Sequence, residues 1–121
     1  MAGTLQLSKE LCWMPAGWVY DNTLERIAER LETSAPELQQ RLLASLTEVN
    51  GGYLDLQRCD STALRTLSAS LAVVTAKVIS SGPNAMHNPS FYDGYVQQLQ
   101  ELYSLLIKRM GELEESASAR R

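Results

Sequence analysis

The chain has 121 residues, of which 45% are hydrophobic, and this size and composition are typical of one small globular domain. Charged residues make up 21% of the chain, which also holds only 7 Gly and 4 Pro, so disordered, collagen-like and low-complexity classes are excluded. Its 14 acidic and 11 basic residues give a formal net charge of −3, whereas nucleic-acid-binding domains need a basic excess to neutralise phosphates. We therefore expect no nucleic-acid partner.

The first twenty residues form an irregular segment that contains both tryptophans, Trp13 and Trp18. Three leucines between residues 5 and 11 fit either a short helix that begins at Ser8 or an extended strap. We expect the tryptophans to close one open end of the fold, because a short helical bundle needs large side chains there.

Helical periodicity begins near residue 23. A first helix is predicted over residues 23–33, because apolar side chains recur at steps of three and four after Asn22, a suitable N-cap. Ser34 and Glu37 form a capping box that predicts a second helix, which we expect to end at the two glycines after Asn50. The short connections favour antiparallel neighbours.

Residues 53–57 alternate in polarity as a short strand would, but the sequence shows no partner strand for them. We therefore interpret this stretch as an ordered connection whose leucines, Leu54 and Leu56, enter the core. Asp60 or Ser61 is expected to cap a third helix that ends at residues 80–83.

The longest apolar stripe follows Asn88 and Pro89, which act as a helix cap and a first-turn proline. The stripe recurs at helical spacing and consists of Tyr92, Tyr95, Leu99, Leu102, Leu106, Met110 and Leu113. Residues 114–121 lack an apolar face and are expected to fray as a tail. The sequence thus predicts an all-α fold, a single-domain antiparallel bundle of about four main helices over residues 1–113, with an irregular Trp-containing N-terminal segment.

No catalytic or metal-binding motif is visible. The single histidine, His87, falls in a predicted loop, and no neighbour in sequence would orient it as a general base. Cys12 and Cys59 lack metal-ligand spacing and are expected to be reduced. We predict a protein that is not an enzyme and needs no cofactor or metal, while carboxylates that converge in space leave catalysis open. No secretory signal or membrane span is predicted, so the cytoplasm is the expected location.

Acidic residues gather in two places. In the first predicted helix, Glu25, Glu29 and Glu32 share one sector, whereas Arg26 and Arg30 share another. Like charges three or four residues apart cost a few tenths of a kcal/mol each, so this sorting calls for a reason outside the helix. Two readings stay open: a neighbouring helix or solvent balances the charges, or the glutamates form a partner surface.

The second acidic group surrounds the loop after the second helix. Glu48, Asp55 and Asp60 lie close together in sequence, opposed only by Arg58, and Tyr53 lies among them. Turn formation by Asp55 and helix capping by Asp60 are local roles that need no partner. An exposed tyrosine among carboxylates is also the composition expected of a recognition site for a basic protein.

Two short sequence motifs resemble those of a known family. They are Asn-Gly-Gly-Tyr-Leu-Asp-Leu at residues 50–56 and Asn-Pro-Ser-Phe-Tyr at residues 88–92, where the final predicted helix begins. With the order of helices, they make residues 18–113 resemble small helical immunity proteins of bacterial contact-dependent inhibition and polymorphic toxin systems. The resemblance implies a protein made in the cytoplasm of the toxin-producing cell. It also implies tight binding to the toxin's C-terminal domain, commonly over the active site.

The function expected from these observations is stoichiometric inhibition of a cognate toxin domain, which should be basic, as a nuclease would be. The expected partner-binding residues are Glu25, Glu29, Glu32, Glu48, Tyr53, Asp55 and Asp60. A helical adaptor or secretion chaperone is the alternative, and it requires the stripe over residues 92–113 to be partly exposed to a partner helix.

Overall fold

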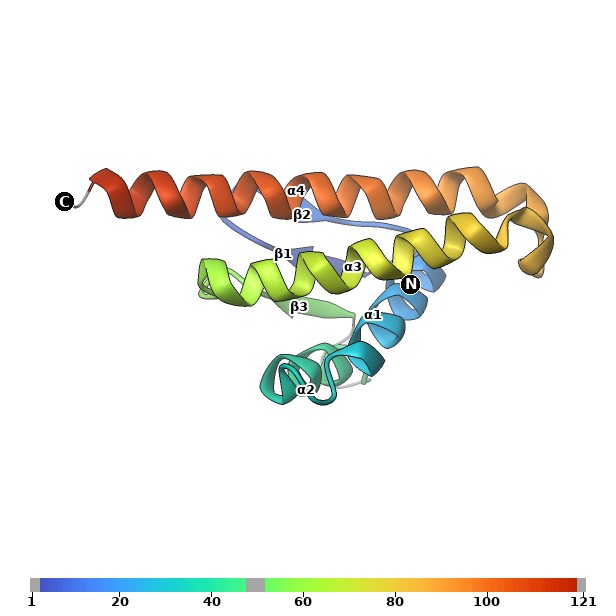
Figure 1. The fold of residues 1–121 in the computed structure, drawn as a ribbon, viewed down its shortest axis with the longest axis horizontal. Coiled ribbons are helices and arrows are strands. Elements are labelled where there is room, and N and C mark those ends of the chain that lie inside the picture. Colours follow the sequence, from blue (N-terminus) through green and yellow to red (C-terminus); the bar gives the residue numbers. More distant parts are fainter. Residues whose placement is uncertain (1–2, 48–51, 120–121) are drawn as a thin grey trace.

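The computed structural model describes residues 3–47 and 52–119, and its described part contains four α-helices and a small three-stranded sheet (Figure 1). The elements are β1 (Thr4–Gln6), β2 (Cys12–Trp13), α1 (Gly17–Arg30), α2 (Pro36–Ala44), β3 (Tyr53–Asp55), α3 (Ser61–Ser81) and α4 (Tyr92–Ala119), with 3₁₀ turns at Pro83–Ala85 and Pro89–Phe91. The predicted all-α class is confirmed in part: the described chain is mostly helical, with four main helices as expected, but it also contains a small sheet that the prediction lacked.

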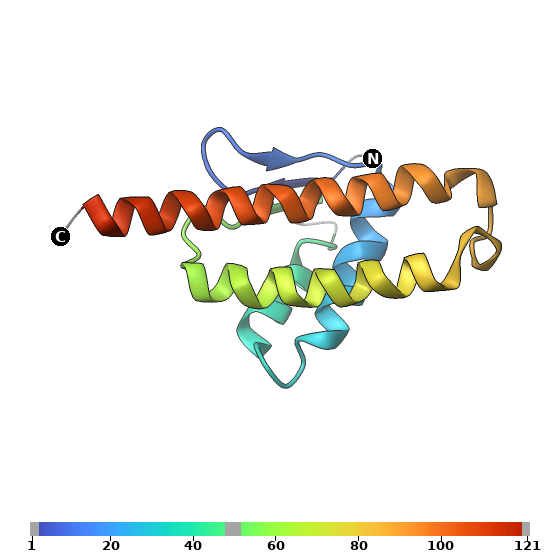
Figure 2. The ribbon, with the colours of Figure 1, turned by 45° about the horizontal axis from the view of Figure 1, so that its top comes forward.

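The two longest helices, α3 and α4, lie side by side and run in opposite directions as a hairpin (Figure 1). The sheet lies behind this hairpin, α1 packs against α3, and α2 packs against α1, as the second view also shows (Figure 2). In both views α1 crosses α3 at a steep angle. The described helices therefore form one antiparallel hairpin with a crossing pair, which is less regular than the predicted bundle.

The sheet corrects our interpretation of residues 53–57. β1 is the central strand and pairs antiparallel with β2, Leu5 opposite Trp13, and parallel with β3, Leu5 opposite Leu54. The partner strand that the sequence did not reveal lies about fifty residues upstream, in the segment without clear periodicity. Leu54 and Leu56 are both buried, as expected.

The N-terminal segment is a hairpin of two strands, β1 and β2. Of the two predicted alternatives, the extended strap is therefore correct and the short helix beginning at Ser8 is wrong. The Leu7 amide donates to the Leu11 carbonyl at 2.9 Å, and the Leu11 amide donates to the Ser8 hydroxyl at 3.0 Å. Trp13 is buried in the core and its indole N–H donates to the Gln98 carbonyl of α4 at 3.0 Å. This bond fastens β2 to α4.

Three helix ends differ from the predictions. α1 begins six residues before the expected start, because Val19 and Tyr20 are buried and extend the apolar stripe upstream. It also ends at Arg30, before the predicted end at residue 33. α2 begins after Ala35 without a side-chain cap, so the predicted capping box is wrong, and it ends at Ala44. At the start of α1, burial of apolar side chains therefore outweighs the capping signal at Asn22.

The last two helices agree better with the sequence. Asp60 caps α3, its carboxylate accepting from the Ala63 amide at 2.8 Å. The stripe of α4 is buried from Tyr95 to Met110. Residues 114–119, expected to fray, are helical up to Ala119, because this stretch consists of Glu, Ala and Ser with no Gly or Pro to break the helix.

Candidate functional site

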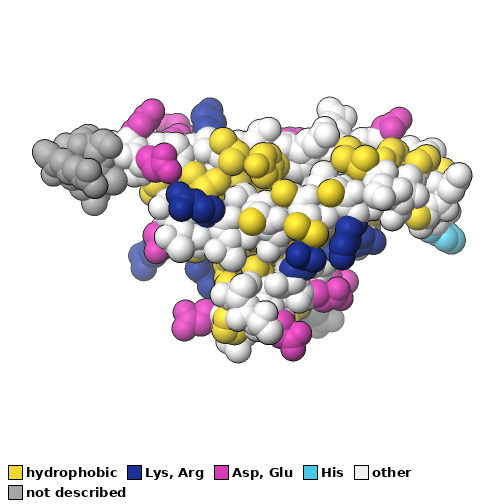
Figure 3. Space-filling view, in the orientation of Figure 1, with side chains coloured by type: hydrophobic (Ala, Val, Ile, Leu, Met, Phe, Trp, Pro, Cys, Tyr) yellow, Lys and Arg dark blue, Asp and Glu magenta, His cyan; other side chains and the backbone are white. Residues whose placement is uncertain are grey.

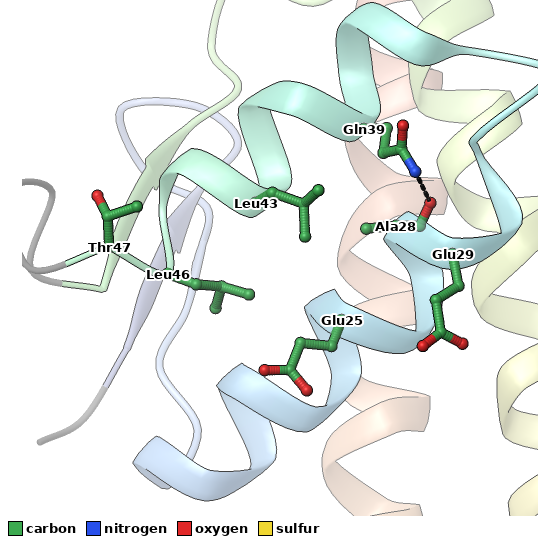
Figure 4. A pocket seen from close by; sticks show the side chains of 7 residues that line it. All are labelled: Glu25, Ala28, Glu29, Gln39, Leu43, Leu46 and Thr47. Carbon is green, nitrogen blue, oxygen red and sulfur yellow. Dashed lines mark hydrogen bonds between the residues drawn. The ribbon is translucent and has the colours of Figure 1, made fainter.

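A groove between α1 and α2 brings two of the predicted site residues together (Figure 4). Its volume is about 400 Å³. The lining residues are Glu25, Ala28, Glu29, Gln39, Leu43, Leu46 and Thr47. We call it the α1–α2 groove.

The α1–α2 groove has an apolar floor and an acidic rim. Glu25 and Glu29 lie one turn apart on α1, so their carboxylates share one edge. Leu43 and Leu46 supply apolar surface from α2 and the turn after it, and Leu43 is 43% exposed. Such a surface suits a segment that combines an apolar side chain with Lys or Arg.

One hydrogen bond holds the two walls of the α1–α2 groove together. The Gln39 side-chain amide donates to the Ala28 carbonyl at 2.9 Å, and Figure 4 draws this bond between α2 and α1. Ala28 itself is buried and small, so the helices approach closely beside it. This bond therefore fixes α1, which carries both rim carboxylates, relative to α2, which carries Leu43.

The rim carboxylates form no ion pair within 4 Å in the described part of the chain, although cations lie nearby. Glu25 and Glu29 are exposed, and neither forms an ion pair with a described residue. They also border a second depression of about 370 Å³ between α1 and α3, where Arg26, Arg30 and Lys77 gather. The neighbouring helix thus places a cation in the same depression without pairing it to the glutamates.

Glu32 does not belong to this rim. The prediction placed it on the helix with Glu25 and Glu29, but α1 ends at Arg30 and Glu32 lies in the turn that follows. The turn changes the direction of the chain, so the helical spacing that aligned the three glutamates no longer applies.

The residues of the predicted acidic loop are placed separately. Tyr53 and Asp55 are exposed on β3, on either side of buried Leu54, so they share one face of the strand. The Asp55 carboxylate accepts from the Gln57 amide at 2.9 Å, and its carbonyl accepts from the Arg41 guanidinium. Glu48 lies outside the described residues.

Local roles thus account for two of the acidic loop residues. Asp55 forms a turn with Gln57, Asp60 caps α3, and Arg41 brings a positive charge to the Asp55 backbone. No hydrogen bond or ion pair between described residues joins Asp55 or Asp60 to the α1–α2 groove.

An aromatic depression was missed by the sequence analysis. Trp18 is 42% exposed and its ring lies 5.9 Å from that of Phe91 and 5.2 Å from that of Tyr95. These rings and His87 line a depression of about 410 Å³ where the connection between α3 and α4 meets α1. α1 begins at Gly17 and places Trp18 in this depression. The predicted helix began at residue 23, so it did not include Trp18.

The surface required by an adaptor or chaperone is buried. Tyr95, Leu99, Leu102 and Leu106 are at most 3% exposed, so the predicted stripe of α4 pairs within the chain and leaves no such stripe for a partner helix. Among the described residues, no group of His, Cys, Asp and Glu is arranged to hold a metal ion.

One described helix, α3, is long and apolar enough to cross a membrane. This is weak evidence, because core helices of soluble proteins have the same length and composition. A comparison of the chain with family models, with curated proteins and with solved structures returns no match.

Proposed function

We propose that the protein is an immunity protein, which binds a basic segment of a cognate toxin domain in the α1–α2 groove and blocks that domain stoichiometrically. The observation that carries the proposal is the pair of exposed carboxylates, Glu25 and Glu29, which form no ion pair with any residue that the structure describes and lie beside the apolar surface of Leu43 and Leu46. Complementary charge would speed encounter, and burial of Leu43 and Leu46 under a partner side chain would slow release.

The exposure of the rim favours binding over catalysis. A carboxylate that serves as general acid near neutral pH is usually shielded from water, which raises its pKa. Glu25 and Glu29 are both exposed at the edge of an open groove. The geometry therefore suits attraction of a positive charge better than proton transfer. That the partner is a toxin is inferred from the family resemblance of residues 50–56 and 88–92, and the groove supports only the basic character of that partner.

The proposal predicts that the double variant Glu25→Gln/Glu29→Gln binds the toxin domain at least about tenfold more weakly, a loss of roughly 1.4 kcal/mol. The loss should fall mainly on the association rate and shrink at high salt, because both side chains lie at the rim. Surface plasmon resonance at low and at high salt measures both quantities. The immobilised partner is the C-terminal domain of a toxin whose gene lies immediately upstream of the gene for this chain.

A matched control removes the same charge elsewhere. Glu101 and Glu115 are exposed on α4, so the variant Glu101→Gln/Glu115→Gln changes the net charge equally and leaves the α1–α2 groove intact. It should bind as the unaltered protein does. Equal affinity of the rim variant and this control would overturn the groove assignment, and absence of any complex with the unaltered protein would overturn the function.

A further inference from the structure

The aromatic depression is a second concave site, and none of its lining residues belongs to the α1–α2 groove. Its volume is about 410 Å³, within the roughly 300–1,000 Å³ of small-molecule pockets. Figure 3 shows the histidine, coloured cyan, at the end of the hairpin where α3 and α4 connect. Three parts of the chain supply the side chains that matter here: α1 with Trp18, Asn22 and Arg26, the connection with His87, and the turn into α4 with Phe91 and Tyr95.

The three aromatic rings give the depression an apolar wall. Tyr95 is buried and supports Trp18 in an edge-to-face contact, with the two ring planes at 75°. Phe91 is 52% exposed, so it and Trp18 both keep ring surface that no residue covers. A further planar ring can pack against that surface in the offset or edge-to-face geometry that aromatic pairs prefer.

Arg26 places a positive group beside this wall. Trp18, Asn22 and Arg26 are spaced by four residues and therefore share one face of α1. The Arg26 Nε atom donates to the Asn22 Oδ1 atom at 2.9 Å, which orients the guanidinium. Among the described residues Arg26 forms no other hydrogen bond and no ion pair. Its two terminal amino groups are thus left to a ligand, and a guanidinium binds a carboxylate with two parallel hydrogen bonds.

The charges of the lining select an anion. Arg26 and His87 line the depression, and no Asp or Glu does. Asp21, Glu25 and Asp93 are near in sequence but do not line it. A cationic ligand would therefore be repelled, although aromatic rings alone would attract one. A polyanion would be repelled by a chain whose net charge is −3, so the charge fits a single carboxylate best.

The depression is already formed without a ligand. In the connection, the Met86 amide donates to the Pro83 carbonyl at 3.1 Å, and the Asn88 side chain accepts from the Ser90 amide at 3.1 Å. These bonds hold the turns that carry His87, and a site that is already ordered loses less conformational entropy on binding. Because three elements enclose it, the site suits a compact ligand, whereas a partner helix or strand needs an elongated groove or a free sheet edge.

We propose that the aromatic depression binds a small aromatic carboxylate, one ring joined to one carboxylate by a short link. The ring packs against Trp18 and Phe91, and the carboxylate accepts hydrogen bonds from the Arg26 guanidinium. The site is separate from the α1–α2 groove, so this inference does not depend on the proposed function.

Nuclear magnetic resonance of the ¹⁵N-labelled protein, titrated with phenylacetate, tests the proposal. The chain has two indole N–H groups, and that of Trp13 is buried and bonded to Gln98, so it serves as an internal reference. Phenylacetate should shift the Trp18 signal and leave the Trp13 signal in place. A dissociation constant of about 1 mM is expected for a ligand of ~10 non-hydrogen atoms. Phenylacetamide, which has the same ring but no charge, should bind about threefold more weakly or worse, and so should the cation benzylamine.

Two variants of equal charge assign the carboxylate contact. Arg26→Gln should weaken phenylacetate binding about threefold or more and leave phenylacetamide binding unchanged, because only the charged contact is lost. Arg30→Gln is the matched control, since Arg30 borders the depression between α1 and α3, as Arg26 does, but does not line the aromatic depression. It should bind phenylacetate as the unaltered protein does. Far-UV circular dichroism verifies that both variants are folded.

Four results would overturn the proposal. The first is an unmoved Trp18 signal at about 10 mM phenylacetate, tenfold above the expected dissociation constant. The second is phenylacetamide or benzylamine binding as tightly as phenylacetate, and the third is an equal loss in folded Arg26→Gln and Arg30→Gln variants. The fourth is tighter binding of N-acetylphenylalanine amide, a neutral mimic of a protein side chain, which would assign the site to a protein partner instead.

Discussion

Tyr20 lies fully buried where the N-terminal strand meets α1, and its ring packs directly on Gly3. A Cβ atom built on Gly3 would lie 2.1 Å from the Tyr20 Cγ atom, far inside van der Waals contact. Gly3 is therefore needed for space, because any larger residue would overlap the Tyr20 ring.

Burial raises the pKa of the Tyr20 phenol. The nearby Ser45 hydroxyl opposes this rise, and the charge of Asp21 adds to it.

Gly3→Ala should lower the free energy of unfolding by about 1–3 kcal/mol, the range of an overpacked core. Gly94 supplies the control, because it lies inside α4 and a Cβ there has no atom within 4 Å. Gly94→Ala should instead stabilise the protein by roughly 0.5–1 kcal/mol through higher helix propensity. Urea unfolding followed by circular dichroism measures both changes, and a Gly3→Ala variant as stable as the parent would contradict the packing.

Among the elements, α3 is where sequence and structure agree most closely. Its cap, Asp60, was one of two residues expected there, because an acceptor before an apolar periodic run satisfies free backbone amides locally. β3 could not be predicted in the same way, since its hydrogen bonds go to β1, far away in sequence. Local signals predict helix ends, whereas strand pairing depends on the tertiary fold.

Two substitutions of Asp60 can distinguish its structural role from a role in binding a partner. Asp60→Ala should cost about 1 kcal/mol of folding free energy, because the Ala63 amide loses its acceptor. Asp60→Asn keeps a capping oxygen and should unfold almost as the parent does, while it removes the negative charge. Thermal unfolding measures the first effect. Weakened toxin binding by a fully stable Asp60→Asn variant would show that the charge also contacts the partner.

For the molecule as a whole, the helical content and the buried stripe of α4 could be predicted from the sequence because both depend on local periodicity. The α1–α2 groove could be predicted only in part. Glu25 and Glu29 were expected to share a face, but the apolar floor around Leu43 comes from how α2 folds back on α1. The packing of two helices brings residues from both together in one site. The periodicity within one helix does not predict which residues of another helix will lie beside it.

Packing across elements also determines whether the chain unfolds as one unit. Trp13 joins the N-terminal strands to α4 through its hydrogen bond to Gln98, and it is 1% exposed. The chain has two tryptophans, so Trp18→Phe leaves Trp13 as the single indole reporter. We expect its fluorescence in urea to change at the same midpoint as the helical circular dichroism signal, because the strands share one core with the helices. An earlier fluorescence transition would contradict the single-domain prediction, since the strands would then detach while α3 and α4 remain folded.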